Sequence, residues 1–492
     1  QNALTTSIFQ LESSGMQRYL KDLKPTEFED IVAMVALYRP GPMQFIPDYI
    51  ERKHGQQKIE YIHPKLEPIL KNTQGIMIYQ EQLMKVAQDI AGFTLGEADV
   101  LRKAVGKKIK LLLDAQEEKF IEGCVKQGTS KKIAEELWQW ILPFAAYGFN
   151  RSHSSAYAMI AYQTAYLKAH YPVEFMASVL TSEKADVERI ALLIEECKKM
   201  DIEVLPPNIN ESLKNFTVVP GKNSPPTDFD AKSKFHSTEP STSKSVGGKI
   251  RFGLLAIKNV GENIIEAIVN ERKKSGEFKS IGDFINRVQS KDLNKKSMEA
   301  LIKSGAFDAF AERNQLLHNL ERLLEIAREN QKNKSNGQIG LFQSATAKAN
   351  NDIRLEPALP AKLLEKLTWE KELLGLYVSS HPLSGFKKLF ESKCFAISKI
   401  DNSMVNKKII LGGLINKVKK IITRSGKPML FIKFEDLTAK TEIVVFPNLL
   451  DRNPDALQEN KVVFISGRVD NRNGEIKIVA DDVQEILVPE ES

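Results

Sequence analysis

The stretch Gly75-Ile-Met-Ile-Tyr-Gln-Glu-Gln82 is followed along the chain by Leu101-Arg-Lys-Ala-Val-Gly-Lys-Lys108, and together these segments are the most informative part of the sequence. Glu97 and Asp99 precede the second segment, which predicts a helix with carboxylates in its first turn and cations in its later turns. Five cations fall within nine residues without an intervening acid, and they are Arg102, Lys103, Lys107, Lys108 and Lys110. The pattern predicts a positive helix face that binds a polyanion, and the alternative is a solvated basic surface.

The bulk composition is typical of a soluble globular protein. The chain has 492 residues, of which 42% are hydrophobic and 27% charged, so it is long enough for about three or four domains. The net charge of +7 and the pI near 8.9 favour a polyanionic partner, because the cations are clustered rather than evenly spread. Nucleic acid is the first candidate.

Cysteine spacing and hydropathy indicate the compartment. Cys124, Cys197 and Cys394 lie far apart, which predicts neither a disulfide framework nor a cysteine zinc site. No apolar run reaches the roughly 18 residues of a membrane span, and the polar start is not a signal peptide. We expect a cytoplasmic protein without membrane contact, and the absence of an initiator Met suggests a fragment.

The first two hundred or so residues read as helices with sharp ends. Thr26 and Glu29 form a possible capping box that opens an apolar helix, and this helix ends at Arg39-Pro-Gly-Pro42 because proline cannot continue it. A further helix is expected from about Ser154 to His170. The pattern predicts a helical domain.

After about residue 405 the period of the apolar residues switches to that of strands. The expected strands are Ile409 to Ile422, Met429 to Phe434, Glu442 to Phe446, Val462 to Val469 and Glu475 to Val483. Turn signals occur at Ser425-Gly426 and at Asn473-Gly474. Five strands in so short a segment predict a small barrel; an OB-fold is the first candidate, and other small β-barrels would give a similar pattern.

Four ungapped stretches resemble one family, the alpha subunit of bacterial replicative DNA polymerase III. They are Phe9-Gln-Leu-Glu-Ser-Ser-Gly-Met16, Ala36-Leu-Tyr-Arg-Pro-Gly-Pro-Met43, the block from Gly75 to Lys108, and Tyr147-Gly-Phe-Asn-Arg-Ser-His-Ser-Ser-Ala-Tyr157. The resemblance covers nearly the whole chain. It identifies a C-terminal fragment of the DnaE type, because the PolC branch of the family lacks an OB-fold domain after its fingers.

The resemblance implies a multidomain α+β protein with a mostly helical fingers domain, a tandem helix-hairpin-helix region and a C-terminal five-stranded OB-fold β-barrel. We expect the end of the palm at residues 1–25, the fingers at 26–218, and a disordered insertion at 219–248, which has too few apolar residues to offset its ordering entropy. The helix-hairpin-helix and clamp-binding region is expected at 249–345. A connecting helical segment at 346–404 and the OB-fold domain at 405–492 complete the chain.

The fingers domain of this family closes on the incoming deoxynucleoside triphosphate (dNTP), whose phosphates require surrounding positive charge. Arg102 and Lys103 match the family's triphosphate-contacting pair, although many relatives have Arg at the second position, where a lysine supplies only a point charge. Arg39 and His153 are further nucleotide-binding candidates. His153 is expected near the sugar, and a structural hydrogen-bonding role is its alternative.

Two-metal nucleotidyl transfer requires closely placed carboxylates that hold Mg²⁺. The family keeps these aspartates in its palm, upstream of the segment that begins at Phe9, and no matching motif occurs in this chain. We therefore assign no catalytic and no metal-binding residue, and we expect this chain to be inactive as a polymerase on its own.

The segment Ile250-Arg-Phe-Gly-Leu-Leu-Ala-Ile-Lys-Asn-Val-Gly-Glu-Asn263 resembles a helix-hairpin-helix, whose hairpin directs N–H groups at a DNA phosphate. Its expected DNA-binding residues are Lys258, Gly261 and Asn263. We interpret Asn263 as the replacement of the usual second hairpin glycine, because Asn tolerates the left-handed conformation.

Residues 291–308, with Leu301-Ile-Lys-Ser-Gly-Ala306, resemble a second, more degenerate copy of this motif. Simple packing of two helices is the alternative for either copy. The neighbouring motifs favour DNA binding.

Gln338-Ile-Gly-Leu-Phe342 resembles the pentapeptide by which this family binds the beta sliding clamp. Gln338, Leu341 and Phe342 suit a small apolar pocket on a partner. The alternative is a loop that buries Leu341 and Phe342 in its own domain.

The first hairpin of the expected barrel is strongly basic and contains no acid between residues 402 and 434. A basic groove of this kind is typical of proteins that bind single-stranded DNA. The candidate contacts are Lys417, Lys419, Lys420 and Arg424. We expect the nearby Phe431 and Phe434 to belong to the core, and a stacking platform for bases is the alternative.

In the intact protein the resemblance implies template-directed DNA synthesis, with primer-template DNA, dNTP, the beta sliding clamp and other polymerase III holoenzyme subunits as partners and Mg²⁺ as cofactor. One alternative is a non-catalytic scaffold that binds DNA and recruits the clamp. The other is an error-prone relative that shares most of these motifs.

Overall fold

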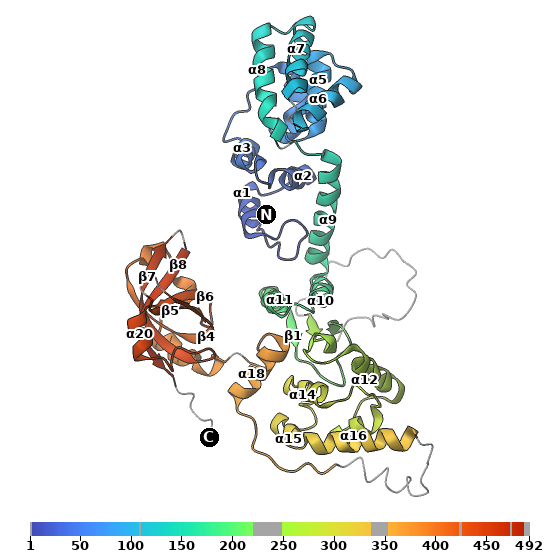
Figure 1. Cartoon of the computed structure of the whole chain (residues 1–492), viewed down its shortest axis with the longest axis vertical. Coiled ribbons are helices and arrows are strands. Elements are labelled where there is room, and N and C mark those ends of the chain that lie inside the picture. The colour runs from blue at the N-terminus through green and yellow to red at the C-terminus, as the bar shows by residue number, and fades with distance from the viewer. Residues whose placement is uncertain are drawn as a thin grey trace. The chain divides into compact units, whose positions relative to one another are not determined.

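The structure is a computed structural model, and it describes residues 2–107, 110–146, 148–219, 248–335, 353–380, 382–422, 426–472 and 475–486. The chain divides into two compact units, residues 1–179 and residues 180–492. Figure 1 colours them from blue to green and from green to red. No helix among the described residues is long and apolar enough to cross a membrane.

The first unit is helical, as the sequence predicts. Its helices are α1 (Ser14–Leu23), α2 (Phe28–Leu37), α3 (Ile46–Lys53), α4 (Glu67–Leu70), α5 (Gln80–Ala91), α6 (Leu95–Lys107), α7 (Lys110–Lys126), α8 (Lys131–Ile141) and α9 (Arg151–His170), and α10 (Pro172–Ser182) crosses the boundary. One apolar core joins α1, α2, α3 and α9, and another joins α4 to α8. The fingers boundaries expected at residues 26–218 stay a prediction.

Helix α2 is apolar on nearly all sides and is buried accordingly; Val32, Ala33 and Met34 have no exposed surface. Its N-cap is Glu27, and the capping box pairs Glu27 with Asp30. The capping box predicted from Thr26 and Glu29 is therefore wrong by one residue.

Helix α9 confirms the helix predicted up to His170, although it begins earlier, at Arg151. The Asn150 side chain caps it by accepting a hydrogen bond from the His153 N–H at 2.8 Å. The buried Ser154 hydroxyl donates to the Val32 carbonyl oxygen at 2.6 Å and ties α9 to α2.

The second unit begins with α11 (Val187–Lys199) and a small sheet of β1 (Glu203–Leu205), β3 (Lys249–Arg251) and β2 (Thr217–Val219), in that spatial order. Val219 of β2 pairs with Lys249 of β3. Nearly all of the insertion predicted at residues 219–248 lies outside the described residues. The next helices are α12 (Glu262–Ser275), α13 (Ile281–Arg287), α14 (Lys295–Lys303), α15 (Arg313–His318), α16 (Leu320–Ser335), α18 (Leu363–Leu374) and α19 (Lys387–Lys393).

The C-terminal part is a closed five-stranded barrel, which confirms the prediction. Its strands are β4 (Lys408–Ile422), β5 (Pro428–Glu435), β6 (Lys440–Val445), β7 (Val462–Arg472) and β8 (Glu475–Glu485), in the spatial order β4-β5-β6-β8-β7, and α20 (Pro447–Arg452) contacts β5 and β8 (Figure 1). β4 pairs with β7 along its first half and with β5 along its second. Leu414 pairs with both neighbours, and a register shift follows between Ile415 and Lys417. Such a bulge lets one strand turn the corner of a barrel.

Candidate functional site

A cavity of about 310 Å³ lies in the first unit. Its walls come from the turn after α2, from α5 and α6, and from the segment before α9. The polar and aromatic part of the lining consists of Arg39, Gln80, Arg102, Phe144 and Phe149. Two cations that lie far apart in the sequence thus face the same cavity.

Backbone pairing between distant segments builds this cavity. The Gln80 N–H donates to the Phe149 carbonyl oxygen at 2.8 Å, and the Phe149 N–H donates to the Ile78 carbonyl oxygen at 3.0 Å. The Gln80 side-chain amide donates to the Gly148 carbonyl oxygen at 3.0 Å. The segments around Gln80 and Phe149 therefore form one structural site.

A single carboxylate, Asp99, binds both cations of the predicted triphosphate pair. Its Oδ1 atom lies 2.8 Å from Arg102 Nη2, and its Oδ2 atom lies 2.7 Å from Lys103 Nζ. Lys103 and Arg102 together hold the pKa of the Asp99 carboxyl below its ordinary value. Arg102 Nη1 also donates to Gln80 Oε1 at 3.1 Å, which fixes the guanidinium at the cavity wall.

Arg39 and His153 both contact the Phe149 ring. The Arg39 guanidinium carbon lies 4.0 Å from the ring centroid, a cation–π geometry. The His153 ring lies 5.5 Å from that of Phe149 and 4.3 Å from that of Tyr157. The cavity lining thus includes Arg39 and Arg102 but neither Lys103 nor His153.

Sequence reasoning missed Gln80 and Phe149 as members of this site. Both lie inside the stretches that carried the family resemblance, and that was the available signal. Of the other cations in the cluster, Lys107, Lys108 and Lys110 have side chains outside the described part of the chain.

The first helix-hairpin-helix copy presents an exposed hairpin. Lys258, Asn259, Gly261 and Asn263 are all exposed. Gly261 is the N-cap of α12 and has no side-chain cap, and a Cβ at Gly261 would meet no atom within 4 Å. The space in front of the α12 N-terminus is therefore open.

The left-handed residue of this hairpin is Asn259, with φ of 69°. Asn263 lies in the first turn of α12 instead. The interpretation of Asn263 as the left-handed hairpin residue is therefore wrong, although Asn does fill such a position.

The second copy is closed by protein. Ser304 and Ala306 are 1% exposed, and Gly305 has a φ of 84°. A Cβ at Gly305 would collide with the Arg313 guanidinium and lie 2.9 Å from the Asp308 carboxylate. Side chains therefore fill the space beside Gly305, whereas the space beside Gly261 in the first copy is open.

On the barrel, strand pairing gathers basic and aromatic side chains on one outer face. Lys417 pairs with Lys433, and Lys419 pairs with Phe431; cross-strand partners lie on the same face of a sheet. The Lys477 ammonium lies 5.9 Å from the Phe431 ring centroid. Lys420 is exposed but belongs to the other side of β4, by alternation.

The two phenylalanines of β5 differ in burial. Phe434 has no exposed surface and belongs to the barrel core. Phe431 is partly exposed among the lysines of the outer face. The expectation that both belong to the core is confirmed for Phe434 and wrong for Phe431.

Several predicted site residues lie outside the described residues. These are Gln338, Leu341 and Phe342 of the clamp motif and Arg424 of the barrel. Within the described residues, no group of three or more His, Cys, Asp or Glu side chains could hold a metal ion.

Comparison with known proteins agrees with these features. Residues 1–128 match the bacterial DNA polymerase III alpha subunit finger domain, residues 201–316 match a helix-hairpin-helix motif, and residues 409–486 match an OB-fold nucleic acid binding domain. The second match begins well before the hairpin of the first copy and ends in α15.

Three similar proteins are each named DNA polymerase III subunit alpha. The chain is 40% identical over 489 residues to that of Borreliella burgdorferi, covering 98% of this chain and 40% of the relative. It is 40% identical over 493 residues to that of Aquifex aeolicus, covering 100% and 38%, and 40% identical over 476 residues to that of Bacillus subtilis, covering 96% and 40%. The chain thus spans about two fifths of the length of these relatives. The matched domains follow in the order expected, and the similarity extends over nearly every residue. The chain therefore belongs to the family of the bacterial DNA polymerase III alpha subunit.

Proposed function

We propose that this chain is the part of a template-directed DNA polymerase that binds the incoming dNTP and the DNA. The nucleotide assignment rests on the cavity that is lined by both Arg39 and Arg102. It lies in the unit that contains the match to the finger domain.

The chemistry of phosphoryl transfer suits this cavity. Negative charge develops towards the leaving pyrophosphate, so fixed cations around the phosphates lower the barrier. Arg102 offers a planar fork, and Lys103 at the rim adds a point charge. A triphosphate would compete with Asp99 for both cations. We place His153 beside the sugar, because it packs on Phe149 at the cavity wall.

A titration of this chain with dATP by calorimetry tests the nucleotide site. Arg102→Ala should weaken binding about 10- to 100-fold, because one charge-assisted interaction contributes about 1.5–3 kcal/mol. Asp99→Asn should strengthen binding at low salt, because it removes the carboxylate shared by the two cations. Lys85→Ala, an exposed cation on α5, serves as the matched control and should have no effect. Equal affinities for wild type and Arg102→Ala would exclude this cavity.

We assign DNA binding to two surfaces of the second unit. At the first hairpin, Lys258, Gly261 and Asn263 surround the open N-terminus of α12, which suits a phosphate. On the barrel, Lys417 and Lys419 flank Phe431, which suits a single strand whose base stacks on the ring. We also assign Lys420, on the other side of β4, to DNA binding, and Arg424 remains a candidate from the sequence alone.

Fluorescence anisotropy with labelled oligo-dT tests the barrel assignment. The double variant Lys417→Ala/Lys419→Ala should lower the slope of log affinity against log salt by about 1.4, because each phosphate contact contributes about 0.7. Phe431→Ala should weaken binding by about 1–3 kcal/mol with an unchanged slope. Lys388→Ala, an exposed cation before the barrel, is the control. Salt-independent binding by the wild-type chain would contradict the assignment.

We propose the beta sliding clamp and other holoenzyme subunits as further partners of the intact protein. Clamp binding is assigned to Gln338, Leu341 and Phe342, and Phe342→Ala should abolish retention of the chain on immobilised clamp. Mg²⁺ belongs to the proposed reaction, but the described residues supply no ligand set for it. We therefore assign it no residue of this chain.

A further inference from the structure

Helix α18 contacts both helix-hairpin-helix copies and the barrel within one turn. The Leu373 carbonyl oxygen accepts a hydrogen bond from the Lys258 N–H at 3.1 Å. Glu370 binds the second copy, and the next residue, Lys371, binds the barrel. These contacts connect one exposed hairpin, one closed hairpin and one basic barrel.

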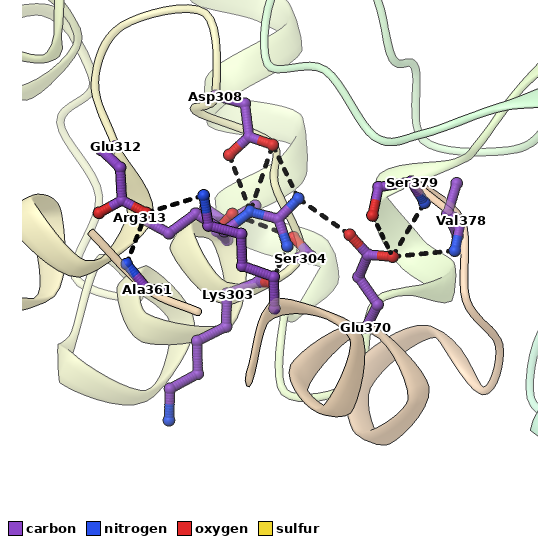
Figure 2. A network of polar contacts seen from close by, with 11 residues as sticks. Lys303, Ser304, Asp308, Glu312, Arg313, Ala361, Glu370, Val378 and Ser379 are labelled. Carbon is purple, nitrogen blue, oxygen red and sulfur yellow. Dashed lines mark hydrogen bonds and ion pairs between the residues drawn. The ribbon is translucent and has the colours of Figure 1, made fainter. Parts of the chain in front are cut away.

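The contact to the second copy is a buried network of charges (Figure 2). Arg313 is 3% exposed; its guanidinium binds Asp308 at 2.7 Å and Glu370 at 2.9 Å. It also donates to the Lys303 carbonyl oxygen at 3.1 Å, at the end of α14. The closed hairpin is thus joined to α18 by a buried ion pair between Arg313 and Glu370.

Glu370 also fixes the chain that leads from α18 towards the barrel. It is 1% exposed, and its Oε2 atom accepts hydrogen bonds from the N–H groups of Val378 and Ser379, each at 2.9 Å. The Ser379 hydroxyl donates to the same oxygen at 3.1 Å. Separation of α18 from the second copy would leave Glu370 buried without Arg313. An unpaired buried charge costs free energy, so this pair opposes the separation.

Lys371 makes the contact to the barrel. Its ammonium donates to Asn416 Oδ1 and to Asn460 Oδ1, both at 3.2 Å, and lies 5.3 Å from the Tyr377 ring centroid. Asn416 is the extra residue of the β4 bulge, directly before Lys417. The bulge therefore directs the Asn416 side chain to α18, directly before the basic residues Lys417 and Lys419.

We propose that α18 couples the first hairpin to the barrel, so that the two bind one DNA molecule together, a duplex with a single-stranded extension. This inference rests on the proposed binding of DNA by each surface. Two linked sites that are held in a fitting geometry raise the effective concentration of the second contact. The gain is lost when the connection no longer fixes that geometry.

Anisotropy titrations of the full chain with four ligands test the coupling. The ligands are a duplex of about 10 base pairs, roughly one turn, oligo-dT of about 10 nucleotides, within the usual range for one OB-fold, and the same duplex carrying that oligo-dT at either its 5′ or its 3′ end. Wild type should bind one tailed duplex at least about 100-fold more tightly than either separate ligand. Lys371→Met should reduce this gain about 10-fold or more and leave both separate affinities unchanged.

Two further variants keep the test interpretable. Asn416→Ala removes a Lys371 partner from the barrel side and should reproduce the loss. Glu372→Gln, at an exposed position of the same helix, should retain the full gain. Unchanged separate affinities show that each variant is folded.

The outcomes separate the coupling from the proposed function. A wild-type chain that binds both separate ligands without a gain for the tailed duplex would overturn the coupling alone. Retention of the gain in both Lys371→Met and Asn416→Ala would overturn the role of α18. Failure of wild type to bind either separate ligand would refute the proposed DNA surfaces, and the coupling with them.

Discussion

At the scale of single residues, Asp30 stands out because it is a carboxylate with 3% exposure. Lys53 Nζ lies 2.8 Å from its Oδ2 atom, and the Thr26 N–H donates to the same oxygen at 2.9 Å. The Tyr49 hydroxyl donates to Oδ1 at 3.4 Å. Burial, followed by the charge of Asp30, raises the pKa of Tyr49. Asp30 thus joins the start of α2 to α3.

We expect Asp30→Asn to lower the free energy of unfolding by about 2–3 kcal/mol, because it leaves Lys53 without its carboxylate in a mostly buried place. Urea denaturation measures this loss. Glu51→Gln, at an exposed position of α3, is the matched control and should change stability by less than about 0.5 kcal/mol. Similar midpoints for both variants would refute the role of Asp30.

Sequence reasoning at this scale found the right residue types but not always the right positions. The capping box was expected one residue too early, at Thr26 and Glu29 rather than at Glu27 and Asp30. Asn263 was interpreted as the left-handed residue, which is Asn259. Neighbouring polar residues satisfy the same local preference, and only the path of the folded backbone decides between them.

At the scale of elements, the corner of the barrel depends on Gly413 in β4. A Cβ at this position would collide with the Glu435 carbonyl oxygen and lie 2.8 Å from the Phe434 ring. Gly413 directly precedes Leu414, where β4 changes partners from β7 to β5, and the bulge between Ile415 and Lys417 follows. A close approach of two backbones requires glycine here.

Gly413→Ala should therefore destabilise the second unit by about 1–3 kcal/mol, the usual cost of overpacking. The apparent melting temperature, followed by circular dichroism in the β region, is the measurement. Gly385→Ala is the comparison, because a Cβ there would meet no atom within 4 Å. A barrel that tolerates both substitutions equally would contradict this account.

The five strands were predicted closely, because alternation and turn residues define strands locally. Alternation also requires that Phe431 and Phe434, three residues apart, face opposite sides of β5. The expectation that both rings belong to the core therefore overlooked a constraint that the alternation itself supplies. Which ring faces outward depends on the pairing of β5 with β4 and β6, which local pattern does not encode.

At the scale of the whole molecule, each unit has described apolar cores of its own, so we expect the two units to unfold in separate transitions. Differential scanning calorimetry should show Asp30→Asn shifting one transition and Gly413→Ala shifting the other. The shift for units of this size is about 2–4 °C per kcal/mol. A single transition that moves with both variants would contradict independent cores.

The order of the domains was predictable from the chain, whereas the candidate nucleotide cavity was only partly so. Arg39 and Arg102 were named from the family resemblance, but Gln80 and Phe149 enter the site through backbone hydrogen bonds between distant segments. Hydrogen bonds between distant segments produce no periodic pattern in the local sequence from which they could be predicted. The closed second hairpin was missed for the same reason, because α18 follows it only much later in the chain.

The pairing of Val219 with Lys249 has a practical consequence. Val219 and Lys249 are paired at one end of the β2–β3 ladder. The two ends of the connection between these strands therefore lie side by side, whatever the length of the connection. Each doubling of such a connection costs only about 0.6 kcal/mol in closure entropy. Relatives can therefore differ greatly in length at this point without altering the sheet, and a fluorescent or affinity module can be inserted there as a reporter.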